Sequence, residues 1–544
     1  MSIQSCINTL IGNLPGDAAI ISPGSRNAPV IFALNHQKQN CYSVVDERSA
    51  GFVALGIAKF TRQPVILSCT SGTAVLNYYP AIAEAYYARV PLIVITADRP
   101  PEQIDTWEGQ AIRQKQVFQH HIRASFETPS SYDEESSFAA VANSVKSCLE
   151  KDIPGPIHIN VPIREPFYAM KELPQSNGDK VSIELVSKKV YLSQIAAVVN
   201  RSFEHKNLMI FHGMEDGEQI QIINDNAVVL SDITANKNSN VAYWDAMLFS
   251  SLSSAGTIDA LKGLKPDILI TTGTTTVSKG LKRFLSIHQP EAHYHISQFN
   301  EVGDLFNTQP QVLNPHLLSK EPATDLPNLS KAYLKAWSKT THSFQQKFSQ
   351  LNWVAYHEFA IVNYILSQLN AADILHLSNS MPVRYASFLM DVVLAKNTVY
   401  SNRGTSGIDG CTSTALGTAL ATDREVYLIT GDLAFFYDIN GLFNQHIPVN
   451  LKIIVLNNAG GGIFNMIAGP ENLGAARNFQ TTPHAYDASH LAHHFGMDYF
   501  ECNSMPALGS NFSQFKQNKK AALLEVKTSN ETDVQFFESF KQIN

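Results

Sequence analysis

Short runs of hydrophobic residues alternate with longer apolar segments along the first third of the chain. Strand-like runs lie within residues 17–27, 64–73 and 91–100, and each ends in a turn that carries Gly, Ser, Asp or Arg. Residues 74–89, between two of these runs, have the length of a helix. A strand followed by a helix, repeated along the chain, predicts a parallel sheet covered by helices on both faces.

The same alternation recurs in two later blocks. A polar stretch with Pro and Gly, residues 170–190, is typical of a linker, and a second polar stretch leads into a helical segment that ends near Trp353. We therefore predict an α/β protein of three domains, each a doubly wound parallel sheet. Their expected ranges are residues 1–180, 190–345 and 355–544.

Two polar dipeptides stand at predicted strand ends in the third block. One strand, residues 426–430, is followed by Gly431 and Asp432, and the next, residues 451–456, leads to a second dipeptide that ends in Asn458. If the two strands are parallel neighbours, both dipeptides lie at the edge where open α/β sheets bind ligands. Their oxygens and a backbone carbonyl of the following "AGGG" suit Mg²⁺, and the glycines let N–H groups approach a diphosphate. Either dipeptide alone would be better explained as an ordinary turn.

Four arginines also follow predicted strand ends. Arg26, Arg99 and Arg403 come directly after such runs, and Arg384 lies just past another. Any one of them could be a solvated surface residue. Four at the ligand-binding edge favour a substrate with several carboxylates, because a guanidinium group pairs with a carboxylate through two hydrogen bonds.

A carboxylate marks the entrance to an apolar segment in "YSVVDERSAGFVALGIAKF", residues 42–60. We expect a strand to end at Val45, a helix to occupy residues 51–59, and Glu47 to lie in the turn between them. Asp46 is available as the helix cap. Glu47 then needs a buried partner, and burial should raise its pKa.

The composition narrows the function further. The formal net charge is −7, which argues against general nucleic-acid binding. The 44% hydrophobic and 16% charged content favours large buried surfaces, including surfaces between subunits. The six scattered cysteines, with no C-x-x-C pair, are expected to be reduced. We see no signal peptide and no apolar run as long as a membrane span, so we expect a cytoplasmic protein.

The paired strand-end dipeptides resemble the thiamine-diphosphate motif, GD followed at a distance by NN, although Leu433 replaces the usual third residue Gly. The setting of Glu47 is similar to that of the glutamate in the pyrimidine-binding domain of these enzymes. Further segments narrow the likeness to the 2-succinyl-5-enolpyruvyl-6-hydroxy-3-cyclohexene-1-carboxylate synthase family of menaquinone biosynthesis. They are "SPGSRNAPV", "TSGTAVLNYYPAIAEA", "TADRPPE", "SNSMPVR", "SNRGTSGIDG" and "NNAGGGIF". The likeness runs from about residue 20 to 467 and is loose in the middle domain.

This resemblance implies a reaction and a division of labour among domains. The family decarboxylates 2-oxoglutarate on thiamine diphosphate and adds the succinyl-semialdehyde carbanion to isochorismate. The first domain would bind the pyrimidine ring and the third the diphosphate with Mg²⁺ or Mn²⁺. Because the two domains come from different subunits in such enzymes, the resemblance implies a homodimer or homotetramer.

The resemblance also assigns roles to residues. Glu47 would be catalytic, by accepting a hydrogen bond from the pyrimidine ring. The metal ligands would be Asp432, Asn458 and the Gly460 carbonyl. The other cofactor-binding residues would be Ile408, which props the bent cofactor, with Gly431, Leu433 and Ile463. The substrate pocket would comprise Ser25, Arg26, Arg99, Gln110, Lys279, Ser380, Arg384 and Arg403, with Phe464 and Ile467 beside Ile463 as its apolar wall.

One family feature is missing from the middle domain. The family has two adjacent basic residues where this chain has Lys279 followed by Gly280, so Lys282 is the candidate substitute. Among the histidines, only those of "HLAHH" (490–494) have ligand-like spacing, and this segment lacks the acid of H-E-x-x-H. All of them, including His484, are interpreted as core or surface residues. Three alternatives remain: a carboligase or decarboxylase of the acetolactate synthase type acting on pyruvate, a non-catalytic cofactor-binding scaffold, and a nucleotide-binding module.

Overall fold

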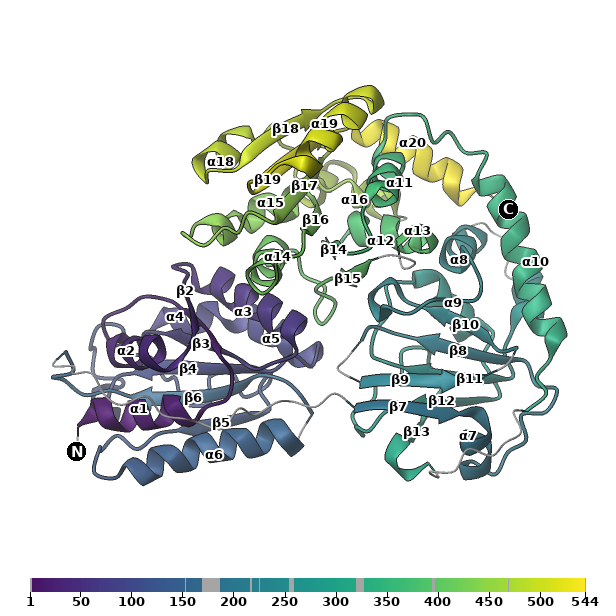
Figure 1. The fold of residues 1–544 in the computed structure, drawn as a ribbon. Helices are drawn as coiled ribbons and strands as arrows, with labels where there is room; N and C mark the ends of the chain where they lie inside the picture. Colours follow the sequence, from purple (N-terminus) through teal and green to yellow (C-terminus); the bar gives the residue numbers. More distant parts are fainter. Residues whose placement is uncertain are drawn as a thin grey trace.

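Three large parallel sheets and one separate pair of parallel strands form the described part of the chain in the computed structural model (Figure 1). The structure describes residues 2–151, 153–168, 186–215, 218–224, 226–253, 259–318, 327–393, 397–467 and 469–543. Every pair of neighbouring strands within these ranges is parallel. This agrees with the α/β prediction. The predicted linker lies mostly outside the described residues, and the domain boundaries stay a prediction.

The first sheet has six strands in the order β2-β1-β3-β4-β6-β5. Its strands are β1 (Ala18–Ile21), β2 (Asn40–Ser43), β3 (Val65–Cys69), β4 (Leu92–Asp98), β5 (Ala124–Glu127) and β6 (Ile157–Pro162). Its helices are α1 (Ile3–Asn13), α2 (Ala28–Gln37), α3 (Glu47–Thr61), α4 (Thr73–Asn77), α5 (Tyr79–Tyr87) and α6 (Glu135–Lys151). The single helix expected over 74–89 is thus two helices, and Pro80, which has no N–H to donate, stands in the first turn of the second.

The middle sheet has five strands in the order β10-β8-β11-β12-β13, with a separate pair, β7 and β9. The strands are β7 (Val186–Tyr191), β8 (Leu208–His212), β9 (Glu218–Ile223), β10 (Val228–Ser231), β11 (Ile268–Thr272), β12 (Ala292–Ile296) and β13 (Gln311–Leu313). The helices are α7 (Leu192–Val198), α8 (Trp244–Ser253), α9 (Lys279–Ile287) and α10 (Lys331–Phe348). Helix α10 runs along the outer side of the molecule toward the third sheet (Figure 1).

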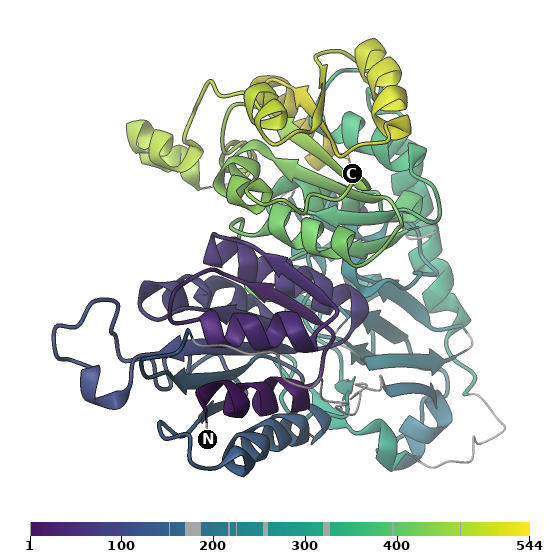
Figure 2. The same cartoon turned by 60° about the vertical axis from the view of Figure 1, so that its left-hand side comes forward.

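The third sheet has six strands in the order β15-β14-β16-β17-β19-β18. They are β14 (Ile374–Leu377), β15 (Thr398–Tyr400), β16 (Val426–Gly431), β17 (Leu451–Asn457), β18 (Asp498–Cys502) and β19 (Ala522–Lys527). The helices are α11 (Glu358–Gln368), α12 (Met381–Phe388), α13 (Met390–Val393), α14 (Cys411–Leu420), α15 (Asp432–Tyr437), α16 (Ile463–Met466), α17 (Asn478–Thr481), α18 (Ser489–His494), α19 (Met505–Gln517) and α20 (Asn530–Lys541). In the turned view the first domain lies directly below the third, with the middle domain beside both (Figure 2).

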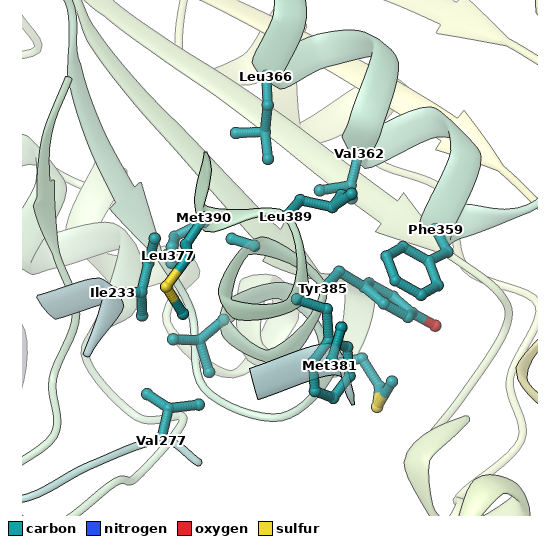
Figure 3. Packing of buried hydrophobic residues seen from close by; sticks show 14 of the residues in the cluster. Ile233, Val277, Phe359, Val362, Leu366, Leu377, Met381, Tyr385, Leu389 and Met390 are labelled. Carbon is teal, nitrogen blue, oxygen red and sulfur yellow. The ribbon is translucent and has the colours of Figure 1, made fainter. Parts of the chain in front are cut away.

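Shared hydrophobic cores join the three sheets. One cluster combines middle-domain residues such as Ile233 and Val277 with Leu377, Met381 and Met390 of the third domain, and Figure 3 shows them facing one another. A second cluster combines α3 of the first domain with α14 of the third. Because apolar burial is the main favourable term in folding, these clusters hold the domains against one another in addition to the peptide segments that connect them.

The α3–α14 contact depends on a glycine. A Cβ atom at Gly56 would lie 2.1 Å from the carbonyl oxygen of Thr414. We expect Gly56→Ala to lower the melting temperature in scanning calorimetry, because overpacking costs about 1–3 kcal/mol and the gain in helix propensity offsets at most about 1 kcal/mol. Gly109→Ala is the control, since a Cβ there meets nothing within 4 Å. An equal effect of both variants would contradict this account.

Candidate active site

The ends of β16 and β17 bring the two polar dipeptides together. The strands are parallel neighbours, with Gly431 in register with Leu456, so Asp432 and Asn458 emerge at the same edge of the sheet. Asp432 begins α15, and its Oδ2 accepts a hydrogen bond of 2.8 Å from the Gly460 N–H. Burial raises the pKa of Asp432, and the N–H groups of Gly460 and Leu433 partly oppose this.

The Asn458 side chain is held with its oxygen available to a ligand. Its Nδ2 donates to Glu358 Oε1 at 3.0 Å, which fixes the orientation of the amide. Its Oδ1 is buried and makes no hydrogen bond among the described residues. A buried oxygen without a partner costs free energy unless something binds it, and amide and carboxylate oxygens are the ligands that Mg²⁺ prefers. The pair Asp432 and Asn458 therefore fits a divalent cation.

Gly460 has the backbone geometry that the third predicted ligand would need. Its φ is +150°, and a Cβ there would lie 2.6 Å from the Thr481 carbonyl oxygen, so glycine is required. Its own carbonyl accepts a 2.9 Å hydrogen bond from the Gly462 N–H, which leaves one lone pair for a cation. A Cβ at Gly431 would meet nothing within 4 Å, so there is open space in front of this strand end.

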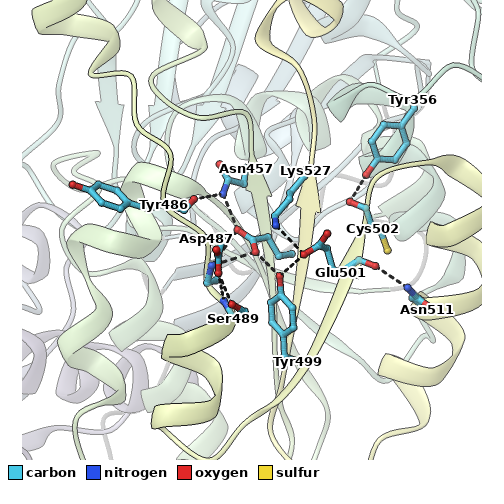
Figure 4. A network of polar contacts seen from close by, with 12 residues as sticks. Tyr356, Asn457, Tyr486, Asp487, Ser489, Tyr499, Glu501, Cys502, Asn511 and Lys527 are labelled. Carbon is cyan, nitrogen blue, oxygen red and sulfur yellow. Dashed lines mark hydrogen bonds and ion pairs between the residues drawn. The ribbon is translucent and has the colours of Figure 1, made fainter.

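The buried carboxylate of Glu525 stabilises the Asn457–Asn458 turn. Glu525 of β19 accepts hydrogen bonds from Asn457 Nδ2 at 2.7 Å and from Tyr499 Oη at 2.6 Å. The Asn457 Nδ2 also donates to the Tyr486 carbonyl, as Figure 4 shows. The first asparagine of the pair thus anchors the turn, and this leaves the second free to face the site.

Two residues that the sequence did not single out touch this site. His484 Nε2 lies 3.2 Å from Asp432 Oδ2, so its interpretation as a core or surface residue was incomplete. The ring of His484 stacks on Tyr486 with centroids 5.4 Å apart. Glu358 is fully buried, and burial together with the nearby Asp533 and Asp432 raises its pKa well above the ordinary value. Neither residue shows a spacing signal, because each comes from a segment far from 432 and 458 in the chain.

Glu47 stands at the start of α3 rather than in a turn before it. The helix begins at Glu47, and Asp46 is its N-cap, with its side chain accepting from the Ser49 N–H at 2.9 Å. The expected helix start at residue 51 was therefore wrong, because the cap and the first turn are built from the charged residues themselves. Burial is the largest cause that raises the pKa of the Glu47 carboxyl.

Arg48, next to Glu47, makes contacts in the third domain. Its Nη2 donates to the Tyr437 carbonyl at 2.7 Å, and its guanidinium lies 4.5 Å from the centre of the Tyr437 ring. Asp46 also reaches this domain, because its Oδ2 accepts from Asn440 Nδ2 at 2.7 Å. The N-terminus of α3 is therefore fixed against the third domain of the same chain.

The structure brings Ser25, Arg26 and Arg99 together at the edge of the first sheet. Arg26 Nη2 and Arg99 Nη1 lie 3.0 and 3.9 Å from one Glu165 oxygen. Ser25 Oγ lies 2.5 Å from the Tyr168 hydroxyl. Gln110 lies beside Gly72 in the neighbouring loop. A carboxylate thus already bridges two of the predicted substrate-binding arginines.

A second basic group lies where the middle and third domains meet. It comprises Lys279, Arg384 and Arg403, and Ser380 lies beside it. Arg384 Nη1 donates to the Ser380 carbonyl, and its pKa is lowered to about 10 by burial and by the charge of Arg403. Burial, and after it Arg384, lowers the pKa of Lys279. No hydrogen bond or ion pair among the described residues joins this group to the first one.

Lys282 lies near the second basic group. A substitute for the basic residue that is missing at position 280 would have to lie there. Burial lowers its pKa, and the charges of Arg403 and Lys279 lower it further. A Cβ at Gly280 would lie 2.8 Å from the Phe249 N atom of α8, so no basic side chain fits there without a shift. Gly280 thus allows the close contact of α8 with α9 in this chain.

The predicted apolar residues line the same side of the third domain. Ile463, Phe464 and Ile467 lie in or directly after α16, which follows the Asn458 turn, and all three are half-buried. Leu433 is half-buried in the first turn of α15. Ile408 is half-buried in the loop that leads from β15 to α14.

No helix among the residues that the structure describes is long and apolar enough to cross a membrane.

Comparisons with known proteins agree with this geometry. Residues 13–124 match the family model for the thiamine pyrophosphate enzyme N-terminal TPP binding domain, and residues 387–526 match that for the C-terminal TPP binding domain. Benzoylformate decarboxylase from Polynucleobacter necessarius has a similar fold, with a TM-score of 0.67 at 15% identity over 97% of this chain and 99% of that one. The chain is therefore a thiamine-pyrophosphate-dependent enzyme, thiamine pyrophosphate being another name for thiamine diphosphate.

The curated relatives narrow the class. Proteins from Cytophaga hutchinsonii and Bacteroides fragilis are 36% and 33% identical, and each comparison covers 96% of this chain and 95% of the relative. A protein from Flavobacterium psychrophilum is 36% identical over 94% of this chain and 92% of its own length. All three are named 2-succinyl-5-enolpyruvyl-6-hydroxy-3-cyclohexene-1-carboxylate synthase. The chain belongs to this synthase family.

Proposed function

We propose that the chain decarboxylates 2-oxoglutarate and adds the resulting four-carbon unit to isochorismate. The products would be 2-succinyl-5-enolpyruvyl-6-hydroxy-3-cyclohexene-1-carboxylate and CO₂. The observation that carries the proposal is the clustering of Arg384 and Arg403 with Lys279 and Lys282 of α9, where the middle and third domains meet. Both substrates are dicarboxylates, which need such a concentration of cationic groups. A pyruvate-specific enzyme handles a single small carboxylate and has no need of it.

The proposed division of roles follows from the chemistry of the groups. Thiamine diphosphate supplies the nucleophilic carbon and the electron sink when it is bound. Glu47 would hold a proton against the pyrimidine ring, and the raised pKa of this carboxyl suits a group that shares a proton. The arginines would orient the substrate carboxylates. Ile408, Leu433 and Ile463 would form the apolar surface against the cofactor.

The metal would be Mg²⁺ or Mn²⁺, held by Asp432, Asn458 and the Gly460 carbonyl. Support comes from the unpartnered Asn458 Oδ1 and from the hard oxygen donors around it. A cation here would also favour the charged forms of Asp432 and Glu358, whose pKa values are raised chiefly by burial.

We also propose that the active site is completed by a second copy of the chain. Among the described residues of one chain, no hydrogen bond or ion pair joins the Arg26–Arg99 group to the Arg384–Arg403 group, yet both are predicted to face the same substrates. A homodimer is the smallest assembly that joins them, and a homotetramer is equally consistent. We also propose a cytoplasmic location, which is the expectation stated above from the signal-peptide and membrane-span features of the sequence.

The test is a turnover assay with substrate choice as its readout. We expect the protein with thiamine diphosphate, Mg²⁺, 2-oxoglutarate and isochorismate to consume isochorismate and release CO₂. Pyruvate in place of 2-oxoglutarate should give little turnover. Turnover of pyruvate with no activity on 2-oxoglutarate would overturn the proposal in favour of an acetolactate synthase type of reaction.

A further inference from the structure

A buried glutamate of the first domain binds a loop of the third domain. Glu84 lies on α5 and is 0% exposed. Its Oε1 accepts a hydrogen bond of 2.8 Å from the Gly404 N–H. Its Oε2 accepts two, from the Thr405 N–H at 2.6 Å and from Thr405 Oγ1 at 2.9 Å. Three donors from one loop thus converge on a single carboxylate across a domain boundary.

Two further features hold the same loop against the first domain. The Lys59 ammonium of α3, whose side chain is half-buried, donates to the Ser401 carbonyl at 2.6 Å. The backbone of Gly404 lies so close to α5 that a Cβ there would be 2.5 Å from the Glu84 carbonyl oxygen. The loop between β15 and α14, residues 401–410, is therefore fixed by side-chain and backbone contacts from α3 and α5.

This loop carries a residue of the proposed substrate pocket. Arg403 directly precedes Gly404, and its Nη1 donates to Asn379 Oδ1 at 2.8 Å. Asn379 in turn donates to the carbonyls of Asn402 and Gly407, at 2.7 and 2.6 Å. The Arg403 Nε is buried and makes no hydrogen bond among the described residues. The guanidinium is thus held at one nitrogen and left available at another.

We propose that Glu84 is a positioning residue for substrate recognition, which sets the place of Arg403 by binding the backbone of the two residues that follow it. The inference rests on the proposed function, in which Arg403 binds a substrate carboxylate. A carboxylate suits this task because it only accepts hydrogen bonds, and all three groups around it are donors. Gln in its place would turn an NH₂ group toward at least one N–H and could not satisfy all three.

The test compares Glu84→Gln with Glu218→Gln. Glu218 is a buried glutamate of the middle domain that likewise accepts from a side chain and a backbone N–H of one loop, Ser297 Oγ at 2.6 Å and Gln298 N at 2.8 Å. Hydrogen–deuterium exchange of peptides covering residues 401–410 is measured without substrate. We expect amide exchange there to be at least about tenfold faster in Glu84→Gln, because hydrogen bonds to a charged group are lost, and unchanged in Glu218→Gln.

Steady-state kinetics give the second readout. In Glu84→Gln, the KM for 2-oxoglutarate or isochorismate should rise about tenfold or more with kcat changed far less, the pattern of lost binding rather than lost chemistry. Glu218→Gln should leave both KM values unchanged. Wild-type exchange at 401–410 in Glu84→Gln, or the same changes in both variants, would overturn the proposal. Because the exchange readout needs no substrate, it stands even if the wild-type protein fails to turn over isochorismate.

A milder variant covers the case in which Glu84→Gln does not fold. Thr405→Val removes only the hydroxyl donor and keeps both backbone hydrogen bonds to Glu84. It should raise exchange and KM in the same direction and by a smaller factor. No change in either quantity would then overturn the proposal.

Discussion

Replacing Glu47 by Gln is expected to lower kcat by about 10²–10⁴-fold, the range that one general acid–base group contributes. The physical reason is the position of this carboxyl at the start of α3, where burial raises its pKa and favours a shared proton. Gln has nearly the same shape, so the helix and the cofactor pocket should persist. Steady-state turnover of isochorismate measures the loss, and titration with thiamine diphosphate, followed by protein fluorescence, checks that binding remains.

The neighbouring carboxylate provides the control for Glu47. Asp46→Asn keeps an N-cap of similar quality for α3. It leaves Glu47 in place, so turnover should stay within a few-fold of wild type. If Glu47→Gln were as active as wild type, Glu47 would have no part in the mechanism and the pyrimidine-binding role of the first domain would have to be reassigned.

Removing the divalent cation should have the second largest effect, on both activity and stability. Asp432 and Glu358 are buried carboxyl groups whose pKa values are raised, chiefly by burial. A bound cation favours their charged forms and so offsets the cost of burying them. At a free Mg²⁺ concentration one hundred times Kd, binding to the folded state alone would add about 2.7 kcal/mol of stability. We expect EDTA to abolish turnover and to lower the melting temperature.

The variant Asp432→Asn should lose most of the Mg²⁺ effect on the melting temperature. Asp438→Asn is the matched control, because Asp438 is a buried aspartate just past the same helix that accepts from Ser413 rather than facing the metal site. It should be less stable yet keep its response to Mg²⁺. A full Mg²⁺ response in Asp432→Asn would exclude this residue as a ligand.

The pH dependence of cation binding has a definite sign. A raised apo-state pKa means that Asp432 takes up a proton at a higher pH than an ordinary aspartate, and the protonated form cannot bind a cation. Mg²⁺ affinity should therefore rise with pH through the acid range and level off once Asp432 is ionised.

The sequence was sufficient for those features that have a local signal. The ends of β16 and β17 could be predicted because an apolar run stops abruptly at Gly431 and again at Asn457. The parallel pairing of these strands then placed Asp432 beside Asn458. Arg99 directly follows the end of β4 in the same way. In each case, strand ends alone decide the edge at which a residue emerges.

Other parts of the site could not be predicted, because they depend on contacts between distant segments. Glu358 reaches Asn458 from a helix 100 positions earlier, and Glu84 reaches Gly404 from 320 positions away. Neither glutamate has a recognisable spacing to its partner in the sequence. A glutamate within an apolar helix is unusual, but the sequence does not indicate which group it binds. The start of α3 was misplaced for a different reason, since a charged first turn looks like a loop until its cap is seen.

The Glu84 and Lys59 contacts bear on how freely the three domains could be exchanged among enzymes. A third domain produced alone would contain Asp432 and Asn458, the residues proposed to bind the metal. Its 401–410 loop would nevertheless lack the carboxylate and the ammonium group that hold it in the whole chain. Swapping a diphosphate domain between relatives would therefore transfer the metal site intact and leave substrate selectivity dependent on the recipient's first domain.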